Sequence, residues 1–334
     1  MRQPTRLKDI ADATGYSANT VSLALRDSPR ISAETRSIIQ AAAQRLDYLP
    51  NLVAQALVSR QTKTIGLVLT DITNPVLTQV ARSIERDLAA RGYSLMLAAT
   101  DNVPEKELRA LEVFRARQVD GILIFPTNHG ELAHIRALRH DGHPVLVLTM
   151  IPSADIDLVA IDDRTGALKA VRHLLERGHL RIAILDAALA LGNREKFDGA
   201  RAAVLQAGLP ETTLIQIRPG GHAAIDGYRS MQTALAMNPR PTAIFATNDS
   251  LALGAIKQCR DNDLNIPKDV AIVGYDNTEV AEYSPVPMTS VDYAAEELSQ
   301  HAVMRILAMT GALPTVHTSK TKLIEPNLVI RRST

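Results

Sequence analysis

The chain has 334 residues, which is enough for two or three domains with cores that fold unaided. Hydrophobic residues make up 46% of it and charged residues 22%, a composition that excludes a wholly disordered protein. The net charge is only +1, but residues 1–64 hold nine basic and five acidic side chains, a net charge of +4, and the rest carries −3. The sequence therefore predicts a basic head on a mildly acidic body.

Residues 1–60 have the pattern of three short helices. The apolar spacing of the first helix ends at Gly15, and Ser17 is placed to cap the second. An Asp-Ser-Pro turn ends that second helix, and Ser32 opens a third one, which ends before Pro50. Three short helices joined by a glycine turn and a proline turn predict a small bundle, and the first two fit a helix-turn-helix.

Beyond Gln61, short apolar runs alternate with amphipathic helical segments. The expected strands are Ile65–Thr70, Ser94–Ala99, Gly121–Phe125, Val145–Thr149, Arg181–Leu185, Thr213–Ile217, Ala243–Ala246 and Val270–Tyr275. The expected helices between them include Val76–Arg91, Leu108–Arg117, Leu168–Arg177 and Phe197–Ala207. This alternation predicts parallel sheets that are covered on both faces. Some nine strands are too many for one modest sheet, so we expect two doubly wound subdomains with a ligand crevice beyond the carboxyl ends of their strands.

The sequence lacks the motifs of common enzymes on such folds. No Gly-x-Gly-x-x-Gly follows the first strand, and no Walker loop, His-Glu-x-x-His or Gly-x-Ser-x-Gly occurs. Cys259 is the only cysteine, so an internal disulfide and a cysteine-based zinc site are excluded, and a small buried hydrophobe is expected there. The pairs His129/His134 and His140/His143 are expected in solvated loops. We expect no catalytic residue, no metal and no cofactor.

Asp162-Asp163 has two interpretations. The two carboxyls could form an acid/base pair, but adjacent side chains in a strand point to opposite faces, which disfavours this. Alternatively, Asp162 bonds the turn amides that precede a helix at Gly166.

The expected compartment is the cytoplasm. Met1 to Lys8 is polar and basic and has no apolar segment of the kind that a secretory signal needs. The most apolar stretches, such as Val145 to Ile151, are far shorter than the roughly 20 residues of a membrane span. We therefore expect no membrane partner.

Several motifs occur in a fixed order along the chain. The head reads Leu7-Lys8-Asp9-Ile10-Ala11, Gly15-Tyr16-Ser17-Ala18-Asn19-Thr20-Val21-Ser22, Ser32-Ala33-Glu34-Thr35-Arg36 and Leu46-Asp47-Tyr48-Leu49-Pro50-Asn51. The body adds Asn74-Pro75, Asp120-Gly121-Ile122, Gly178-His179-Leu180-Arg181, Thr247-Asn248-Asp249, Val273-Gly274-Tyr275-Asp276 and Ser284-Pro285. Over nearly its whole length the chain resembles the LacI/GalR-family transcription regulators.

The resemblance implies a small all-α helix-turn-helix headpiece followed by an α/β periplasmic-binding-protein-like body of two doubly wound parallel-sheet subdomains. The implied headpiece covers residues 1–50, and a hinge helix and linker cover 51–63. The effector-binding and dimerisation domain covers 64–334. Its N-subdomain is expected at about 64–161 plus 292–318, and its C-subdomain at about 162–291 plus 319–334.

The resemblance also implies a set of DNA-binding residues. The second helix would lie in a major groove and present Ala18, Asn19 and Leu23 to base edges, with Asn19 paired to adenine. Many relatives carry arginine where Leu23 stands, so a guanine contact is not expected there. The remaining implied contacts, to phosphates and to the minor groove, are made by Thr5, Ser17, Thr20, Ser22, Arg26, Asn51, Gln55 and Leu57.

Some of these implied contacts have a structural alternative. Thr20 and Ser22 could serve helix capping and packing. Leu57 takes the place of a leucine that wedges between base steps, and its alternative is the apolar face of a short hinge helix with Val53. Gln55 and Ala56 replace a frequent Arg-Ser pair, which removes one expected contact.

The implied effector-binding residues are Asp71, Asn74, Val76, Thr149, Lys196, His222, Asn248 and Asp276. Val76 and Thr149 stand where relatives often carry an aromatic and an acidic side chain, and His222 stands where they often carry an aromatic one. This substitution pattern is a poor match for a typical stacked sugar. Lys196 and His222 would suit a ligand with an anionic group, unless Lys196 is a surface lysine and His222 a loop residue.

The resemblance implies a homodimeric, sequence-specific DNA-binding transcriptional regulator, most often a repressor in such families, and no enzyme. Its implied partners are a roughly palindromic double-stranded operator and a sugar, sugar acid or similar polar metabolite bound between two subdomains. An inducer and a corepressor would use the same crevice. Two other classes stay open, a solute-binding protein and an enzyme on a doubly wound fold. Deleting residues 1–60 separates them from the regulator, since only a regulator loses specific DNA binding.

Overall fold

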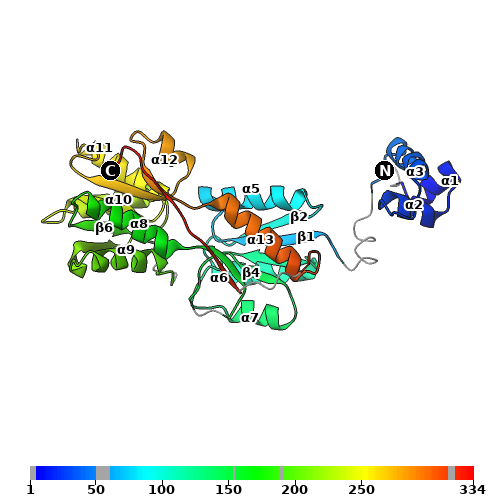
Figure 1. The fold of residues 1–334 in the computed structure, drawn as a ribbon, viewed down its shortest axis with the longest axis horizontal. Coiled ribbons are helices and arrows are strands. Elements are labelled where there is room, and N and C mark those ends of the chain that lie inside the picture. Colours follow the sequence, from blue (N-terminus) through cyan, green and yellow to red (C-terminus); the bar gives the residue numbers. More distant parts are fainter. Residues whose placement is uncertain (1–4, 50–60, 153–154, 188–191, 315–319) are drawn as a thin grey trace. The chain divides into compact units, whose positions relative to one another are not determined.

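The structure is a computed structural model that describes residues 5–49, 61–152, 155–187, 192–314 and 320–334. The chain divides into two compact units, Met1–Thr62 and Lys63–Thr334. Figure 1 colours the first unit blue and the second from cyan to red. In the described ranges, none of the helices has both the length and the apolar character that crossing a membrane requires.

The first unit contains three helices, α1 (Leu7–Thr14), α2 (Ala18–Leu25) and α3 (Ala33–Arg45). Gly15 ends α1 with φ 72°, the left-handed conformation that glycine adopts without strain. The hydroxyls of Ser17 and Ser32 cap α2 and α3 by accepting from the amides of Thr20 and Thr35. The three expected helices and both serine caps are confirmed. A small apolar core between them holds Ile10, Val21, Ala24, Ile39 and Ala42.

The second unit contains two six-stranded sheets. The first is wholly parallel, in the order β11-β5-β4-β3-β1-β2. Its strands are β1 (Thr64–Leu69), β2 (Ser94–Ala99), β3 (Gly121–Ile124), β4 (Val145–Val147), β5 (Leu158–Ile161) and β11 (Thr321–Ile324). The second has the order β12-β10-β9-β8-β6-β7 and is parallel except for β12. Its strands are β6 (Ile182–Leu185), β7 (Leu214–Ile217), β8 (Ala243–Ala246), β9 (Ala271–Asp276), β10 (Thr289–Asp292) and β12 (Leu328–Val329).

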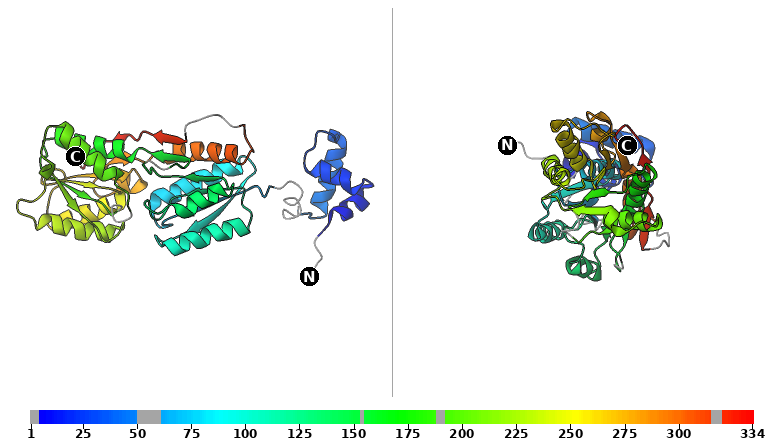
Figure 2. Two further views of the ribbon diagram at one scale, coloured as in Figure 1. Left: turned by 90° about the horizontal axis from the view of Figure 1, so that it is seen from below. Right: turned by 90° about the vertical axis from the view of Figure 1, so that its left-hand side faces the viewer.

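Helices cover both faces of each sheet (Figure 2). On the first sheet, α5 (Pro75–Ala89) and α13 (Ala295–Met309) lie over the face that holds Ile65 and Leu67, and α6 (Pro104–Ala116) and α7 (Ala133–His140) lie over the face that holds Val68. On the second sheet the pairs are α8 (Asp163–Glu176) with α9 (Glu195–Gln206), and α10 (Ala224–Leu235) with α11 (Asp249–Asp261). A short helix α12 (Glu279–Tyr283) follows β9. Two doubly wound subdomains are therefore present, as the alternating pattern predicts.

Three segments of the chain connect the two sheets, and one of them corrects an expected boundary. The connections run from β5 to α8, from β10 to α13 and from β11 to β12. Residues 319–334 were expected in the C-subdomain, but β11 belongs to the first sheet, where Thr321 pairs with Leu158. Without β11, the strand β5 would be the edge of this sheet, and β11 pairs with its backbone groups before the chain crosses to β12.

The described residues form twelve strands, where the sequence pattern predicts some nine. The strands absent from the expected set, β5, β10, β11 and β12, each have only two to four residues. In β10, Thr289 and Ser290 are fully buried because their hydroxyls find partners inside the protein. A hydrophobic pattern does not detect such a strand, since the apolar signal comes from side chains alone.

Candidate functional site: a headpiece surface and an interdomain cleft

The N-terminal turn of α2 presents the side chains that were expected to read bases. Ala18 and Asn19 are exposed there, while Leu23 is half-buried one turn later. Val21 and Ala24, on the opposite side of the helix, are buried in the core of the bundle. The helix therefore keeps Asn19 on a solvent face.

The expected phosphate-binding residues are already engaged within the headpiece. Ser17 Oγ accepts from the Thr20 amide at 3.1 Å and shares a hydrogen bond with Thr20 Oγ1 at 2.9 Å. The guanidinium of Arg26 donates to Ser22 Oγ at 2.5 Å, and Thr5 Oγ1 donates to the carbonyl of Leu46 at 2.8 Å. Both oxygens in the Ser17–Thr20 pair stay exposed or half-exposed, so capping and a phosphate contact are compatible. The other three expected residues lie outside the described part of the chain: Asn51, Gln55 and Leu57.

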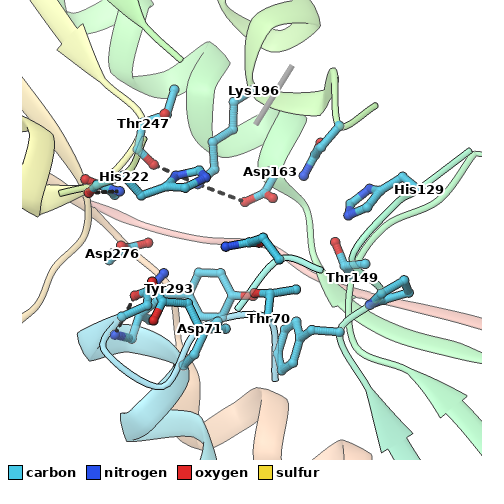
Figure 3. Close-up of a pocket in the computed structure, with 18 of the residues that line it drawn as sticks. Thr70, Asp71, His129, Thr149, Asp163, Lys196, His222, Thr247, Asp276 and Tyr293 are labelled. Atoms are coloured by element: carbon cyan, nitrogen blue, oxygen red, sulfur yellow. Dashed lines mark hydrogen bonds and ion pairs between the residues drawn. The ribbon is translucent and has the colours of Figure 1, made fainter. Parts of the chain in front are cut away.

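In the second unit, a cleft of about 150 Å³ lies between the carboxyl ends of the two sheets. Figure 3 shows it with Asp71, Thr149 and Tyr293 on one side and Lys196, His222 and Thr247 on the other. All eight residues that were expected to bind the effector line it: Asp71, Asn74, Val76, Thr149, Lys196, His222, Asn248 and Asp276. The structure thus brings together side chains that are up to 205 positions apart in the sequence, because parallel strands end at one edge of each sheet.

On the first-sheet side, the loop after β1 holds the lining residues in a fixed turn. Asp71 Oδ1 accepts from the amide and the hydroxyl of Thr73, both at 2.7 Å. Asn74 Oδ1 caps α5 by accepting from the Val76 amide at 3.1 Å. Val76 itself is buried, so this wall of the cleft is apolar below a polar rim.

Among the cleft-lining residues that the structure describes, Lys196 is the only lysine or arginine. Its ammonium group is already bound by the protein. Its Nζ donates to the carbonyl of Thr247 at 2.9 Å and lies 4.0 Å from Asp163 Oδ1. It also lies 3.7 Å from the centre of the Tyr275 ring. The expectation of a surface lysine is therefore wrong, since only 14% of this side chain is exposed. Three partners already satisfy the charge that an anionic ligand would need.

The carboxyl group of Asp276 is the most deeply buried acid in the cleft. It ends β9, it is 7% exposed, and its φ of 103° is rare for a residue with a side chain. No hydrogen bond reaches this carboxyl from the described residues. Burial raises its pKa well above the ordinary value; Lys196 opposes that rise, and Asp249 and Asp163 add to it. A carboxyl group that opens into a cleft without a hydrogen bond from the described residues is a group that a ligand can bind.

Asn248 and His222 form the remaining wall. Asn248 caps α11, because its Oδ1 accepts from the Leu251 amide at 2.7 Å while its Nδ2 donates to the His222 carbonyl at 3.1 Å. The amide group therefore serves the fold as well as the cleft. Burial, with help from the charge of Lys196, lowers the pKa of His222, and Asp71 and Asp226 oppose that shift. The imidazole is thus a neutral hydrogen-bonding group at neutral pH.

Several lining residues were not expected at a site. Asp163 accepts from the Tyr275 hydroxyl at 2.7 Å and faces Lys196. Asp162 caps α8 by accepting from the Thr165 amide at 2.9 Å, so the capping interpretation of this acidic pair is confirmed. Tyr293, after β10, also lines the cleft. Of these residues, only Asp163 could have been found from the sequence. It comes just after a predicted strand and begins a helix, and ligand sites of such folds lie at the carboxyl ends of the strands.

Two of the histidines expected in solvated loops are placed otherwise. His129 lines the cleft, and burial lowers the pKa of its imidazole. His134 lies 2.5 Å from the buried carboxyl of Glu107. His129 does lie in a loop, but His134 lies in the first turn of α7, so the loop expectation is wrong for His134. Cys259, in contrast, is buried in the core between α10 and α11, as expected.

A metal centre has no support in the part of the chain that the structure describes, where no group of three His, Cys, Asp or Glu side chains is placed to hold an ion. The described chemistry is that of a binding site with hydrogen-bonding groups and buried carboxyls.

Comparison with known proteins connects both surfaces to one family. Residues 6–51 match the model of bacterial regulatory proteins of the lacI family, and residues 171–334 match that of a periplasmic binding protein-like domain. The chain is 33% identical to the HTH-type transcriptional regulator DegA of Bacillus subtilis (strain 168), an alignment that covers 99% of this chain and 98% of that one. It is 31% identical to the ribose operon repressor of Escherichia coli (strain K12), over 89% and 90% of the two chains.

Solved structures show the same similarity in three dimensions. The Lac repressor dimer bound to operator and the anti-inducer ONPF matches with a TM-score of 0.89 at 26% identity, over 99% of each chain. A LacI family regulator from Enterococcus faecium with bound ribose matches with a TM-score of 0.72 at 29% identity, over 81% of this chain and 98% of that one. From its helix-turn-helix head to its two-sheet body, this chain therefore belongs to the LacI family of DNA-binding transcription regulators, which are not enzymes.

Proposed function

We propose that the protein is a homodimeric repressor that binds a roughly palindromic operator and changes its affinity for it when a small polar ligand occupies the cleft. The observation that carries the ligand part of this proposal is the Asp276 residue, which is 7% exposed and lines the cleft without a side-chain hydrogen bond from the described residues. The repressors and effector complexes among the relatives support the same assignment. As a DNA-binding regulator the protein would act in the cytoplasm, where its operator is.

The DNA contacts are proposed for the exposed end of α2. Asn19 is the only amide side chain on this helix, and an amide can bond an adenine edge with both of its polar atoms. Ser17, Thr20 and Arg26 would contact phosphates beside it. The +4 charge of residues 1–64 doubles in a dimer, so the affinity should fall steeply with salt concentration.

The proposed ligand is a neutral, hydroxyl-bearing ring compound of monosaccharide size. A cleft of about 150 Å³ is comparable to cavities that admit a single six-membered ring. Three carboxyl groups, on Asp71, Asp163 and Asp276, face one ammonium group that the protein already binds. This balance favours a ligand with hydrogen-bond donors over a sugar acid, because an added negative charge would meet carboxyls rather than a free cation.

Selection of DNA from a random pool tests the DNA-binding half of the proposal. The full chain should enrich an inverted repeat, and residues 61–334 alone should enrich none. Fluorescence anisotropy with the selected DNA should then show a dissociation constant that rises strongly between 50 and 200 mM salt, roughly 10³-fold for six phosphate contacts. Specific binding by residues 61–334 alone would overturn the proposal.

A thermal-shift panel tests the ligand half. D-glucose and D-glucuronic acid both form a six-membered ring and differ only in the oxidation, and hence the charge, at C6, and other aldose and uronic acid pairs extend the panel. A ligand at 100 times its Kd stabilises the protein by about 2.7 kcal/mol. At least one neutral member should raise Tm in the wild-type protein and fail to do so in Asp276→Asn. A panel in which only acids stabilise the protein would contradict the assignment.

The proposed dimer contact uses apolar side chains that the monomer leaves exposed. Leu97 lies on the edge strand β2 and is 39% exposed, and Val113 on the neighbouring α6 is 46% exposed. On the second sheet, Ile225 is 53% exposed beside a groove of about 600 Å³ between α10 and α11. An apolar groove such as the one beside Ile225 is a feature of interfaces between subunits, whereas single exposed side chains are common on any protein surface. Sedimentation should give a dimer for the wild-type protein and a monomer for Ile225→Asp.

A further inference from the structure

The turn that follows β9 holds an unusual backbone. Asp276 has φ 103° and Asn277 has φ 50°, so two consecutive residues with side chains lie in the left-handed region. Such conformations persist only where neighbouring groups hold them. This turn aims the Asp276 carboxyl into the cleft, so whatever holds the turn also sets the position of that carboxyl (Figure 3).

The buried side chain of Asp249 accepts hydrogen bonds from this turn and from a neighbouring strand. It lies in the first turn of α11, is 2% exposed and does not line the cleft. Its Oδ2 accepts from the amide of Thr278 at 2.7 Å and from the hydroxyl of Thr278 at 3.0 Å. Its Oδ1 accepts from Ser290 Oγ at 2.6 Å.

Ser290 extends this network to the residue next to Asp276. Its Oγ accepts from the amide of Asn277 at 3.0 Å while its proton goes to Asp249. The backbone amides of both residues after Asp276 therefore end on the Asp249 carboxylate, one directly and one through Ser290. A change in the backbone of this turn would break these hydrogen bonds and leave a buried oxygen of Asp249 or Ser290 without its donor, which is unfavourable.

Two neighbouring residues fit this arrangement. A Cβ on Gly274 would lie 2.4 Å from Asp249 Oδ1, so a glycine is needed for the carboxylate to approach β9. Arg331 donates to Asn277 Oδ1 at 2.8 Å and to the carbonyl of Met288 at 2.9 Å, which braces the same turn from its outer side. Four separate segments of the chain thus meet at this turn.

We propose that Asp249 is a positioning residue for the effector cleft, which holds the backbone of residues 276–278 so that the Asp276 carboxyl is presented to the ligand. The proposal rests on the proposed function, in which Asp276 contacts the effector. Asp249 itself touches no ligand in this arrangement and acts through Ser290 and Thr278.

Hydrogen exchange of the full-length protein, read at single-amide resolution, tests this without any ligand. In Asp249→Asn the amides of Asn277 and Thr278 should exchange at least tenfold faster than in the wild-type protein. The strands of the first sheet should keep their wild-type rates. Asp263→Asn, which changes an exposed acid just after α11, serves as the matched control and should change neither amide.

Two milder variants keep the test decisive if Asp249→Asn does not fold. Ser290→Ala should accelerate the amide of Asn277 and leave that of Thr278 protected, since only the first depends on the serine. Thr278→Val should leave both amides close to the wild-type rate, because it removes a hydroxyl and keeps the amide bond.

The proposal is overturned if Asp249→Asn leaves both amides at wild-type rates, or if exchange increases equally across both sheets, as a purely structural role requires. Equal acceleration of both amides in Ser290→Ala would also overturn it. Failure of the proposed function would appear elsewhere, as a wild-type protein that no member of the ligand panel stabilises.

Discussion

Replacing Lys196 with methionine removes its ammonium group from the cleft and keeps most of the buried stem. The Thr247 carbonyl then loses its donor, which costs about 1–3 kcal/mol. The cation–π contact with Tyr275 is also lost, at about 1–2 kcal/mol. Part of this is offset, because methionine needs no desolvation of a charge. We expect a net loss of about 2 kcal/mol, or a fall in Tm of about 4–8 °C at roughly 2–4 °C per kcal/mol.

Lys169→Met is the matched control for this change. Lys169 also donates to a carbonyl, that of Pro326 at 2.8 Å, and pairs with Glu325, but that pair lies away from the cleft and Glu325 is 67% exposed. Solvent screening limits the loss from the ion pair to under about 1 kcal/mol. The Pro326 carbonyl also loses its donor, as the Thr247 carbonyl does, so Lys196→Met should lose more stability than the control mainly through the cation–π contact with Tyr275. Scanning calorimetry of the full-length variants gives both values, and the best neutral panel ligand should still stabilise both variants, because the Lys196 ammonium is already bound within the protein. Equal calorimetric losses in the two variants, or a neutral ligand that stabilises Lys169→Met but not Lys196→Met, would refute the reasoning.

The remaining predictions concern the headpiece and pH. Ser17→Ala and Ser32→Ala should each cost about 1 kcal/mol in urea unfolding, but only Ser17→Ala should weaken operator binding in anisotropy; equal weakening would argue against a phosphate contact. Asn19→Ala should lose about 1–3 kcal/mol of discrimination at one base pair in a competition assay, and an unchanged preference would remove its proposed role. Burial raises the pKa of Asp249 to about 6, so the folded state holds this proton more tightly than the unfolded chain. As the pH rises from 4 to 6, the unfolding free energy of the wild-type protein should therefore fall by up to about 3 kcal/mol relative to that of Asp249→Asn, and above pH 6 the difference should stay level. Urea unfolding of both proteins at several pH values measures this difference.

Local sequence signals predicted the headpiece well because its helices begin and end at residues with one physical role. Ser17 and Ser32 supply the oxygen that the first amides of a helix need, and Gly15 accepts a left-handed turn. The eight effector positions also meet in one cleft, which follows from parallel strands that end at a common edge.

The parts that the sequence did not predict depend on partners far along the chain. β11 pairs with β5 across 163 positions of the sequence, as in Thr321 and Leu158, and no local pattern specifies which sheet an edge strand completes. Lys196 reads as a surface residue until Thr247 and Tyr275 are placed around it. The interpretation of Lys196 as a partner for an anion changes for the same reason, since its charge is bound within the protein.

Operator affinity with and without a cleft ligand tests the account most directly. The dissociation constant of the full chain for its selected operator should change at least tenfold when the best panel ligand is saturating, since the two sites are coupled through one equilibrium. Asp276→Asn should bind the operator as the wild-type protein does without ligand and show no change when ligand is added. An operator affinity that is the same with and without bound ligand, or a ligand effect that survives in Asp276→Asn, would contradict the account.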